Sequence, residues 1–201
     1  MTTASPEAGV SIRPMQLADV PRVVDLQAAL LGESAVTQLG AAFLRRFYTV
    51  ALARDVAHGF VACAASGAIV GAALATGDNT RFSTVVTPRV APWLAAALAT
   101  RWRLAVRFAA GVFETAPPGQ GSAELLLLFV AGSAQRSGLG ARLLERVEDD
   151  FAAMGLGGYR VSLRSEVPGA QAFYLARGFQ HEQEVMVLGR PMTYLTKALS
   201  R

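Results

Sequence analysis

The chain has 201 residues, of which 52% are hydrophobic, and a formal net charge of +4. This length fits one domain, residues 1–201, with a core large enough to fold without covalent cross-links. The lone cysteine, Cys63, excludes a disulfide framework within the chain and favours a reducing, cytoplasmic location.

Charge and histidine content narrow the classes of partner. The positive charge comes almost entirely from arginine, which favours a polyanionic ligand. The chain lacks a long basic run interleaved with aromatics, so we expect no nucleic-acid partner. His58 and His181 have no acidic or cysteine partners at ligand spacing, so we expect surface imidazoles and no metal site. Residues 1–10 do not resemble a secretory signal.

The first 54 residues predict a strand from Ile12 and then two helices. Asp19 is expected to cap the first helix, with Pro21 tolerated in its first turn. In the second helix, apolar residues recur every three to four positions between Leu39 and Val50, which predicts one amphipathic face packed on a sheet.

Residues 59–77 are uncharged and long enough to raise the question of a membrane span. Ser66 and Gly67 interrupt the segment at its centre, between two runs rich in β-formers. A buried β-hairpin with a tight turn is therefore the preferred interpretation.

Residues 79–122 are rich in alanine and arginine and hold both tryptophans, which predicts a helical insertion closed by a flexible loop at Gly119–Gly121. Three roles stay open for it. It is a packing or homodimer element, a lid on a substrate site, or a basic amphipathic helix lying on an anionic membrane surface.

The most informative segment runs from Leu125 to Leu144, an apolar strand followed by a Gln-Arg-x-Gly-x-Gly turn and a helix. Gly138 and Gly140 let the backbone approach a bulky anion, and the first helical turn offers unpaired N–H donors. The spacing excludes a P-loop and a Rossmann fingerprint. The alternative is a simple strand-to-helix turn.

At Gln135–Gly140 the chain resembles the GNAT superfamily of acetyl-CoA-dependent N-acetyltransferases. A second family element follows at residues 172–179, read as AFYLARGF. The resemblance implies an α/β fold in which a mixed, mostly antiparallel sheet of six to seven strands is flanked by helices. The helical insertion at residues 79–122 lies before the cofactor-binding strand and outside the resemblance.

The resemblance also implies where acetyl-CoA binds. Backbone groups of Leu128, Phe129 and Val130 would pair with the pantetheine arm as if it were another strand. The pyrophosphate would lie on the turn formed by Gln135, Arg136, Ser137, Gly138, Leu139, Gly140 and Ala141.

For catalysis, the resemblance assigns Tyr174 as the acid that protonates the departing thiolate. The alternative is a helix aromatic that packs in the core. The general base is not fixed by resemblance, and Glu124 is the leading carboxylate, ahead of Glu166 and Asp78. Glu124 is alternatively an ordinary solvated residue. The N–H of Val130 is expected to meet the developing oxyanion, on a distorted strand.

Two positions depart from the family pattern. Many members carry an asparagine seven residues before the tyrosine, where this chain has Val167, so one side-chain contact to the cofactor is expected to be missing. A common site for a glutamate, on the strand before Arg164, holds Ser162.

The implied function is transfer of an acetyl group from acetyl-CoA to a primary amine of a small molecule, by direct attack in a ternary complex. The pattern is similar to bacterial members, some of which act on amino sugars. Two alternatives stay open: a non-catalytic acyl-CoA-binding module that is regulatory or membrane-associated, and an enzyme for a longer acyl chain.

Overall fold

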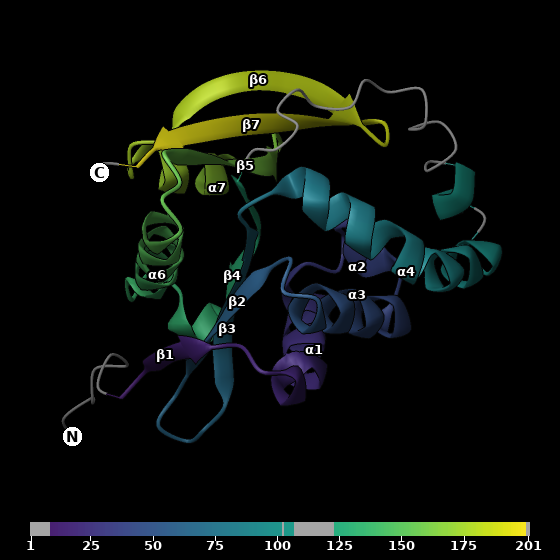
Figure 1. The fold of residues 1–201 in the computed structure, drawn as a ribbon, viewed down its shortest axis with the longest axis horizontal. Coiled ribbons are helices and arrows are strands. Elements are labelled where there is room, and N and C mark those ends of the chain that lie inside the picture. The colour runs from purple at the N-terminus through teal and green to yellow at the C-terminus, as the bar shows by residue number, and fades with distance from the viewer. Residues whose placement is uncertain (1–8, 102, 107–122, 200–201) are drawn as a thin grey trace.

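The computed structural model describes residues 9–101, 103–106 and 123–199. These residues form a seven-stranded sheet in the order β1-β2-β3-β4-β5-β7-β6. Every neighbouring pair is antiparallel except β4 and β5, which are parallel. Helices flank both sides of the sheet (Figure 1). This mixed, mostly antiparallel α/β architecture is the one that the sequence predicted.

The strands have between four and nine residues. Their bounds are β1 Ser11–Pro14, β2 His58–Cys63, β3 Ile69–Thr76, β4 Ala123–Val130, β5 Gly158–Arg164, β6 Gln180–Val187 and β7 Arg190–Ala198.

The uncharged segment at residues 59–77 is a hairpin of β2 and β3, as predicted. Gly67 adopts a left-handed φ of 79° at the turn, a conformation that glycine takes without a Cβ penalty. No helix among the described residues is long and apolar enough to cross a membrane.

Three helices rather than two connect β1 to β2: α1 Val20–Leu30, the short α2 Ala35–Gln38 and α3 Ala41–Ala53. The predicted capping role of Asp19 is wrong in detail. Its carboxylate accepts from the N–H of Gln16 and from Arg13, so it fixes the 3-10 turn η1 Leu17–Asp19 rather than the start of α1. Helix α3 packs mainly on α1 and α4 and less on the sheet.

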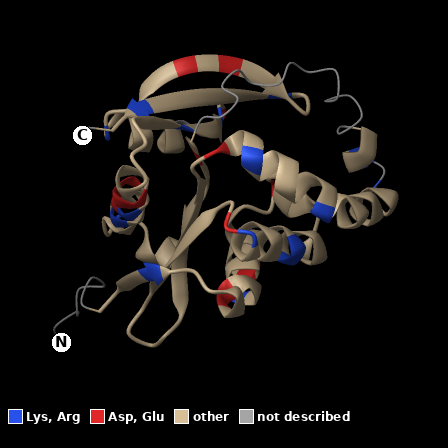
Figure 2. Cartoon of the chain, viewed as in Figure 1, with Lys and Arg blue, Asp and Glu red and all other residues tan. Residues whose placement is uncertain are grey.

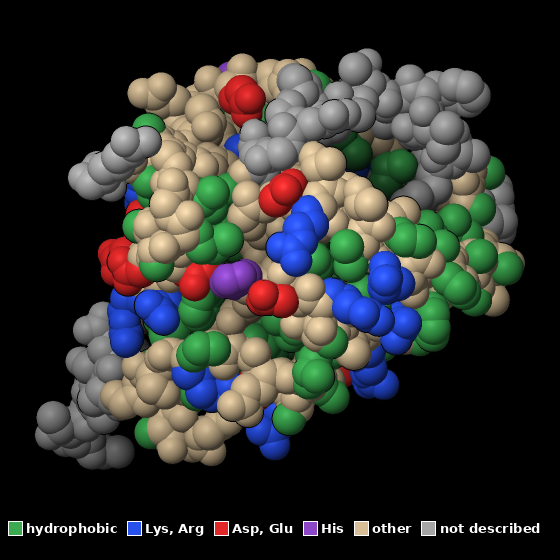
Figure 3. Space-filling view, viewed as in Figure 1, with side chains coloured by type: hydrophobic (Ala, Val, Ile, Leu, Met, Phe, Trp, Pro, Cys, Tyr) green, Lys and Arg blue, Asp and Glu red, His purple; other side chains and the backbone are tan. Residues whose placement is uncertain are grey.

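The chain between β3 and β4 begins with the long helix α4, Asn79–Ala99. Asp78 caps it by accepting hydrogen bonds from the N–H groups of Thr80 and Arg81. Figure 2 shows an acidic residue, coloured red, at the start of the helix. Figure 3 shows hydrophobic side chains gathered at the other end of the helix. The loop predicted at Gly119–Gly121 lies outside the described residues.

The sheet separates two hydrophobic clusters. Side chains of α1, α3 and α4 pack on one face, which we call the α1 face. Side chains of α6, Leu139–Ala153, and α7, Pro168–Leu175, pack on the other, the α6 face. Figure 1 shows α6 and the helices α1 to α4 on opposite sides of the sheet.

Strand β4 contains an irregularity that changes which of its side chains point to each face of the sheet. Leu74 pairs with Leu127 and Ala75 pairs with Leu125, so Leu126 is an extra residue in β4. Such a bulge shifts the alternation of faces. Ala123 and Leu125 therefore pack on the α6 face before the bulge, and Leu128 and Val130 pack there after it.

Candidate active site

Strands β4 and β5 separate at their carboxyl ends. Their parallel pairing runs only from Ala123 with Tyr159 to Leu125 with Val161, although β4 continues to Val130 and β5 to Arg164. The side of β4 that faces β5 therefore has backbone groups beyond Leu125 that are not paired with β5. A wedge between two strands is suited to an extended ligand that carries amides.

The turn after β4 is shaped for an anion. Gly138 has a left-handed φ of 75° and precedes α6, whose first turn leaves N–H groups without intrahelical acceptors. Arg136 is also left-handed, with a φ of 62°. The turn is held by two side chains, because Gln135 donates to the Val130 carbonyl at 3.1 Å and Ser137 donates to that of Ala134 at 2.7 Å.

Gly140 has a different reason to be glycine. A Cβ there would lie 3.4 Å from the Phe173 ring, at the limit of ordinary contact, so the absence of a side chain lets α7 lie close to the start of α6.

A cleft of about 770 Å³ joins the wedge to this turn. That volume is in the range of small-molecule and cofactor sites. Nine of the predicted site residues line it: Leu128, Phe129, Val130, Gln135, Arg136, Gly138, Gly140, Ala141 and Tyr174. The structure thus brings together residues that are separated by up to 46 positions in the sequence.

Three predicted site residues are not among those that line the cleft. The Ser137 hydroxyl is used within the turn, and the Leu139 side chain is buried on the α6 face. Glu124 lies earlier on β4, four residues before Leu128, which corresponds to about 13 Å along a strand.

The cleft has further walls that the sequence did not identify. Leu30 and Leu31 border it from the end of α1, and Val167, Phe173 and Arg177 border it from α7 and its flanks. Arg177 stacks on the Phe173 ring at 3.8 Å, which places a cation beside the cleft. The AFYLARGF element contains both residues and was the signal that could have predicted this wall.

Tyr174 is 6% exposed and packs edge to face against Phe173 and Phe179. Burial raises the pKa of its phenol, because the charged phenolate would lose solvation. The group is therefore held in its protonated form, as a proton donor must be.

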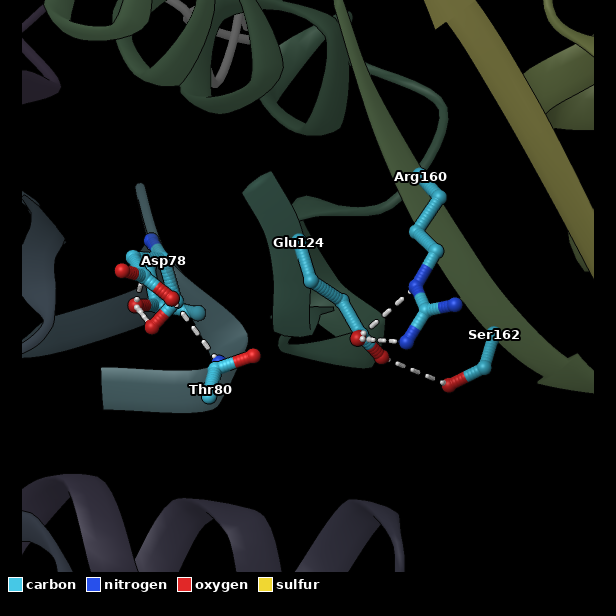
Figure 4. A network of polar contacts seen from close by, with 6 residues as sticks. Asp78, Thr80, Glu124, Arg160 and Ser162 are labelled. Carbon is cyan, nitrogen blue, oxygen red and sulfur yellow. Dashed lines mark hydrogen bonds and ion pairs between the residues drawn. The ribbon is translucent and has the colours of Figure 1, made fainter. Parts of the chain in front are cut away.

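Glu124 is a buried carboxylate on the α1 face, since its neighbours Ala123 and Leu125 pack on the other. Arg160 of β5 donates to its Oε2 from Nε at 3.1 Å and from Nη2 at 3.0 Å (Figure 4). Burial raises the pKa of Glu124, and the charge and hydrogen bonds of Arg160 act in the opposite direction. The alternative of a solvated Glu124 is therefore wrong.

The two other candidate carboxylates are engaged elsewhere. Asp78 caps α4, and Glu166 is an exposed residue that pairs with Arg164 at 2.6 Å. Arg164 lowers the pKa of Glu166, which weakens it as a base near neutral pH. Arg164 also contacts Glu33 at 3.4 Å and so links β5 to the connection after α1.

His58 has a partner that the sequence did not predict. Its Nδ1 lies 2.7 Å from Oδ2 of Asp150 on α6, and this pair links α6 to the start of β2. Among the described residues no group of three or more potential metal ligands is found.

A mixed sheet with one splayed parallel pair, a glycine-containing turn at the start of α6 and a buried tyrosine beside the wedge form an arrangement that fits an acyltransferase. Residues 109–195 match the family described as Acetyltransferase (GNAT) domain. The matched segment contains β4, the turn at Gly138 and Tyr174, and the match indicates an acyltransferase.

Solved structures with the same fold are distant in sequence. SsHAT is 24% identical with a TM-score of 0.65, and an acetyltransferase of the GNAT family from Desulfovibrio desulfuricans is 16% identical with a TM-score of 0.63; each match covers 96% of this chain and 100% of that chain. A chimera of the spermidine N-acetyltransferase SpeG from Vibrio cholerae is 16% identical, with a TM-score of 0.63 and 96% of both chains covered. No curated protein matches the chain.

Proposed function

We propose that the protein transfers an acetyl group from acetyl-CoA to a primary amine of a small molecule. The observation that carries the proposal is the cleft that joins the unpaired side of β4 to the turn at Gly138. Its two ends match the two parts of the cofactor. The extended, amide-bearing pantetheine fits the wedge, and the pyrophosphate fits the N–H donors at the start of α6.

The proposed reaction is direct attack in a ternary complex. Glu124 takes one proton from the ammonium, and the free amine attacks the thioester carbonyl. The C–N bond forms and the C–S bond breaks. Tyr174 protonates the departing thiolate, and the second amine proton, released as the amide forms, restores the phenol.

Glu124 suits the role of base because of where it meets β5. Ser162 is the first β5 residue beyond the last pair of the parallel ladder, and its hydroxyl lies 3.4 Å from Glu124 Oε1. The carboxylate thus reaches the closed end of the wedge, where the pairing of β4 and β5 stops, on the α1 face. Its distance from the cleft-lining residues implies that the proton passes through water between the amine and Oε1.

Support for a small-molecule amine as the acceptor comes from a protein of the same fold. The spermidine N-acetyltransferase among the structures of the same fold acts on a small-molecule amine. Amino sugars and polyamines are therefore the first acceptors to test. We also infer that residues 1–201 are one domain, in which the insertion at 79–122 contributes to acceptor choice, because loops select substrates on a shared cofactor core.

A thiol-release assay tests the proposal directly. The purified protein is incubated with acetyl-CoA and with amino sugars, polyamines, amino acids or peptides, and free CoA thiol is measured. We expect release with one class of small amine. Release with peptides alone would contradict the acceptor class, and tight acetyl-CoA binding without any release would favour a non-catalytic acyl-CoA-binding module.

A further inference from the structure

Arg160 occupies the position on β5 directly beside Glu124 in the parallel ladder. Both side chains are almost fully buried, 5% exposed for Arg160 and 9% for Glu124. A buried charge is costly unless it is paired and hydrogen-bonded, so each of these groups needs the other.

The two oxygens of Glu124 are not equivalent. Oε2 accepts two hydrogen bonds from the Arg160 guanidinium, whereas Oε1 has the long 3.4 Å contact with the Ser162 hydroxyl (Figure 4). Two N–H donors on one oxygen fix the orientation of the carboxyl group. Oε1 is therefore the oxygen that retains capacity to accept a proton.

Arg160 is itself held in place by the next strand. Its guanidinium carbon lies 5.2 Å from the ring centroid of Tyr194, which pairs with Ser162 across β5 and β7. A planar guanidinium over an aromatic ring loses little additional freedom when it binds a carboxylate.

We propose that Arg160 is a positioning residue for acetyl transfer, which orients Glu124 so that Oε1 faces the closed end of the wedge. This inference rests on the proposed role of Glu124 as the base. Arg160 acts through Glu124 and needs no contact with the amine or the cofactor.

The charges around Glu124 set the expected direction of the pH effect. Arg160 faces it from β5, Glu182 from β6 and the Tyr194 phenol from β7, while Asp78 lies nearby at the start of α4. Glu182 raises the pKa of Glu124, and Arg160 opposes this effect. Removing the guanidinium therefore raises that pKa, so the ionised base is formed only at higher pH.

The experiment compares Arg160→Gln, Arg160→Lys, Glu124→Gln and the double variant Glu124→Gln/Arg160→Gln, using the best amine from the thiol-release assay. Arg160→Gln should lower kcat/KM for the amine roughly 10-fold or more and shift the acidic limb of its pH profile upward, with KM for acetyl-CoA changed less than about 2-fold. Arg160→Lys, which keeps the charge, should recover part of the rate.

The double variant distinguishes positioning from an independent role. If Arg160 acts through Glu124, the double variant should have the same rate as Glu124→Gln alone. It also removes both buried charges, so we expect it to fold even if Arg160→Gln is destabilised by the unpaired charge of Glu124. Arg45→Gln on α3, where the arginine is 54% exposed, is the matched control and should behave as wild type.

Two results would contradict the proposed roles of Arg160 and Glu124 separately. An Arg160→Gln variant with the wild-type rate and pH profile, beside an inactive Glu124→Gln, would overturn the role of Arg160 alone. A fully active Glu124→Gln would remove the base from the proposed function, and the role of Arg160 with it.

Discussion

Tyr174 combines two properties that rarely occur together in a core aromatic. Its ring is packed between Phe173 and Phe179, yet the residue lines the cleft. Burial holds the phenol in its protonated form by raising its pKa. Core packing, one of the two interpretations that the sequence left open, is therefore observed, and it is compatible with the predicted role as a proton donor.

Replacing Tyr174 with phenylalanine should separate chemistry from binding. The variant keeps the ring contacts and loses only the proton donor, so kcat should fall roughly 10-fold or more while the Kd of acetyl-CoA changes less than about 2-fold. Steady-state kinetics and calorimetry measure the two quantities. Tyr159→Phe, which loses a hydroxyl bonded to Glu148 away from the cleft, is the control and should keep kcat. A fully active Tyr174→Phe would end the assignment.

At the scale of single residues, the sequence predicted the turn well because its glycines have a local cause. Gly138 needs a left-handed backbone, which can be inferred from one motif. Arg160 could not be found in this way, because its partner is 36 positions away and becomes a neighbour only when β4 and β5 pair. The same holds for Asp150 beside His58.

Among the secondary-structure elements, a buried hydrogen-bond network fixes the α1 side of the cleft. The Tyr48 hydroxyl of α3 donates to Gln27 Oε1 at 2.7 Å, and Gln27 Nε2 donates to Thr37 of α2 at 3.0 Å. All three residues are buried. The network joins α1, α2 and α3 around the connection that begins with Leu31, a residue of the cleft wall.

Tyr48→Phe should lower the free energy of unfolding by about 1–3 kcal/mol, because Gln27 Oε1 is left buried without its donor. Urea denaturation at constant slope measures the change. Ser83→Ala removes an exposed hydroxyl on α4 and should stay within about 0.5 kcal/mol of wild type. A Tyr48→Phe variant as stable as this control would show that the network contributes nothing.

The sequence predicted the boundaries of the elements correctly where turn residues mark them. It did not predict them where contacts between distant residues determine them. Ser66 and Gly67 predicted the β2–β3 hairpin correctly. Helix α2 was missed because four residues carry no periodic signal, and Asp19 was misassigned because Arg13 and the Gln16 N–H compete for its carboxylate. The extra residue Leu126 lies in a uniform run of leucines, which gives no sign of a bulge.

For the molecule as a whole, the cleft exists because one parallel pair is inserted into an antiparallel sheet. The two strands are paired up to Leu125 and Val161, and beyond these residues they diverge toward the starts of α6 and α7. The family pattern predicted a mixed, mostly antiparallel sheet, but the depth of the wedge and the wall from α1 emerge only from the packed structure. A cleft built this way depends on both halves of the chain.

A calorimetric titration of wild type, Gly138→Glu and Gly155→Glu with acetyl-CoA tests whether the turn at Gly138 holds the pyrophosphate. Gly138 and Gly155 have nearly the same left-handed backbone, with φ of 75° and 74°, and each has open space where a Cβ would lie. They lie at opposite ends of α6, so only the first is beside the proposed pyrophosphate site.

We expect saturable binding of one acetyl-CoA per chain by wild type and by Gly155→Glu, and an affinity at least roughly 100-fold weaker for Gly138→Glu. The added carboxylate would repel the pyrophosphate and occupy the position where the helix start attracts an anion. Absence of binding by wild type, or equal affinity for wild type and Gly138→Glu, would contradict the assignment of the cleft.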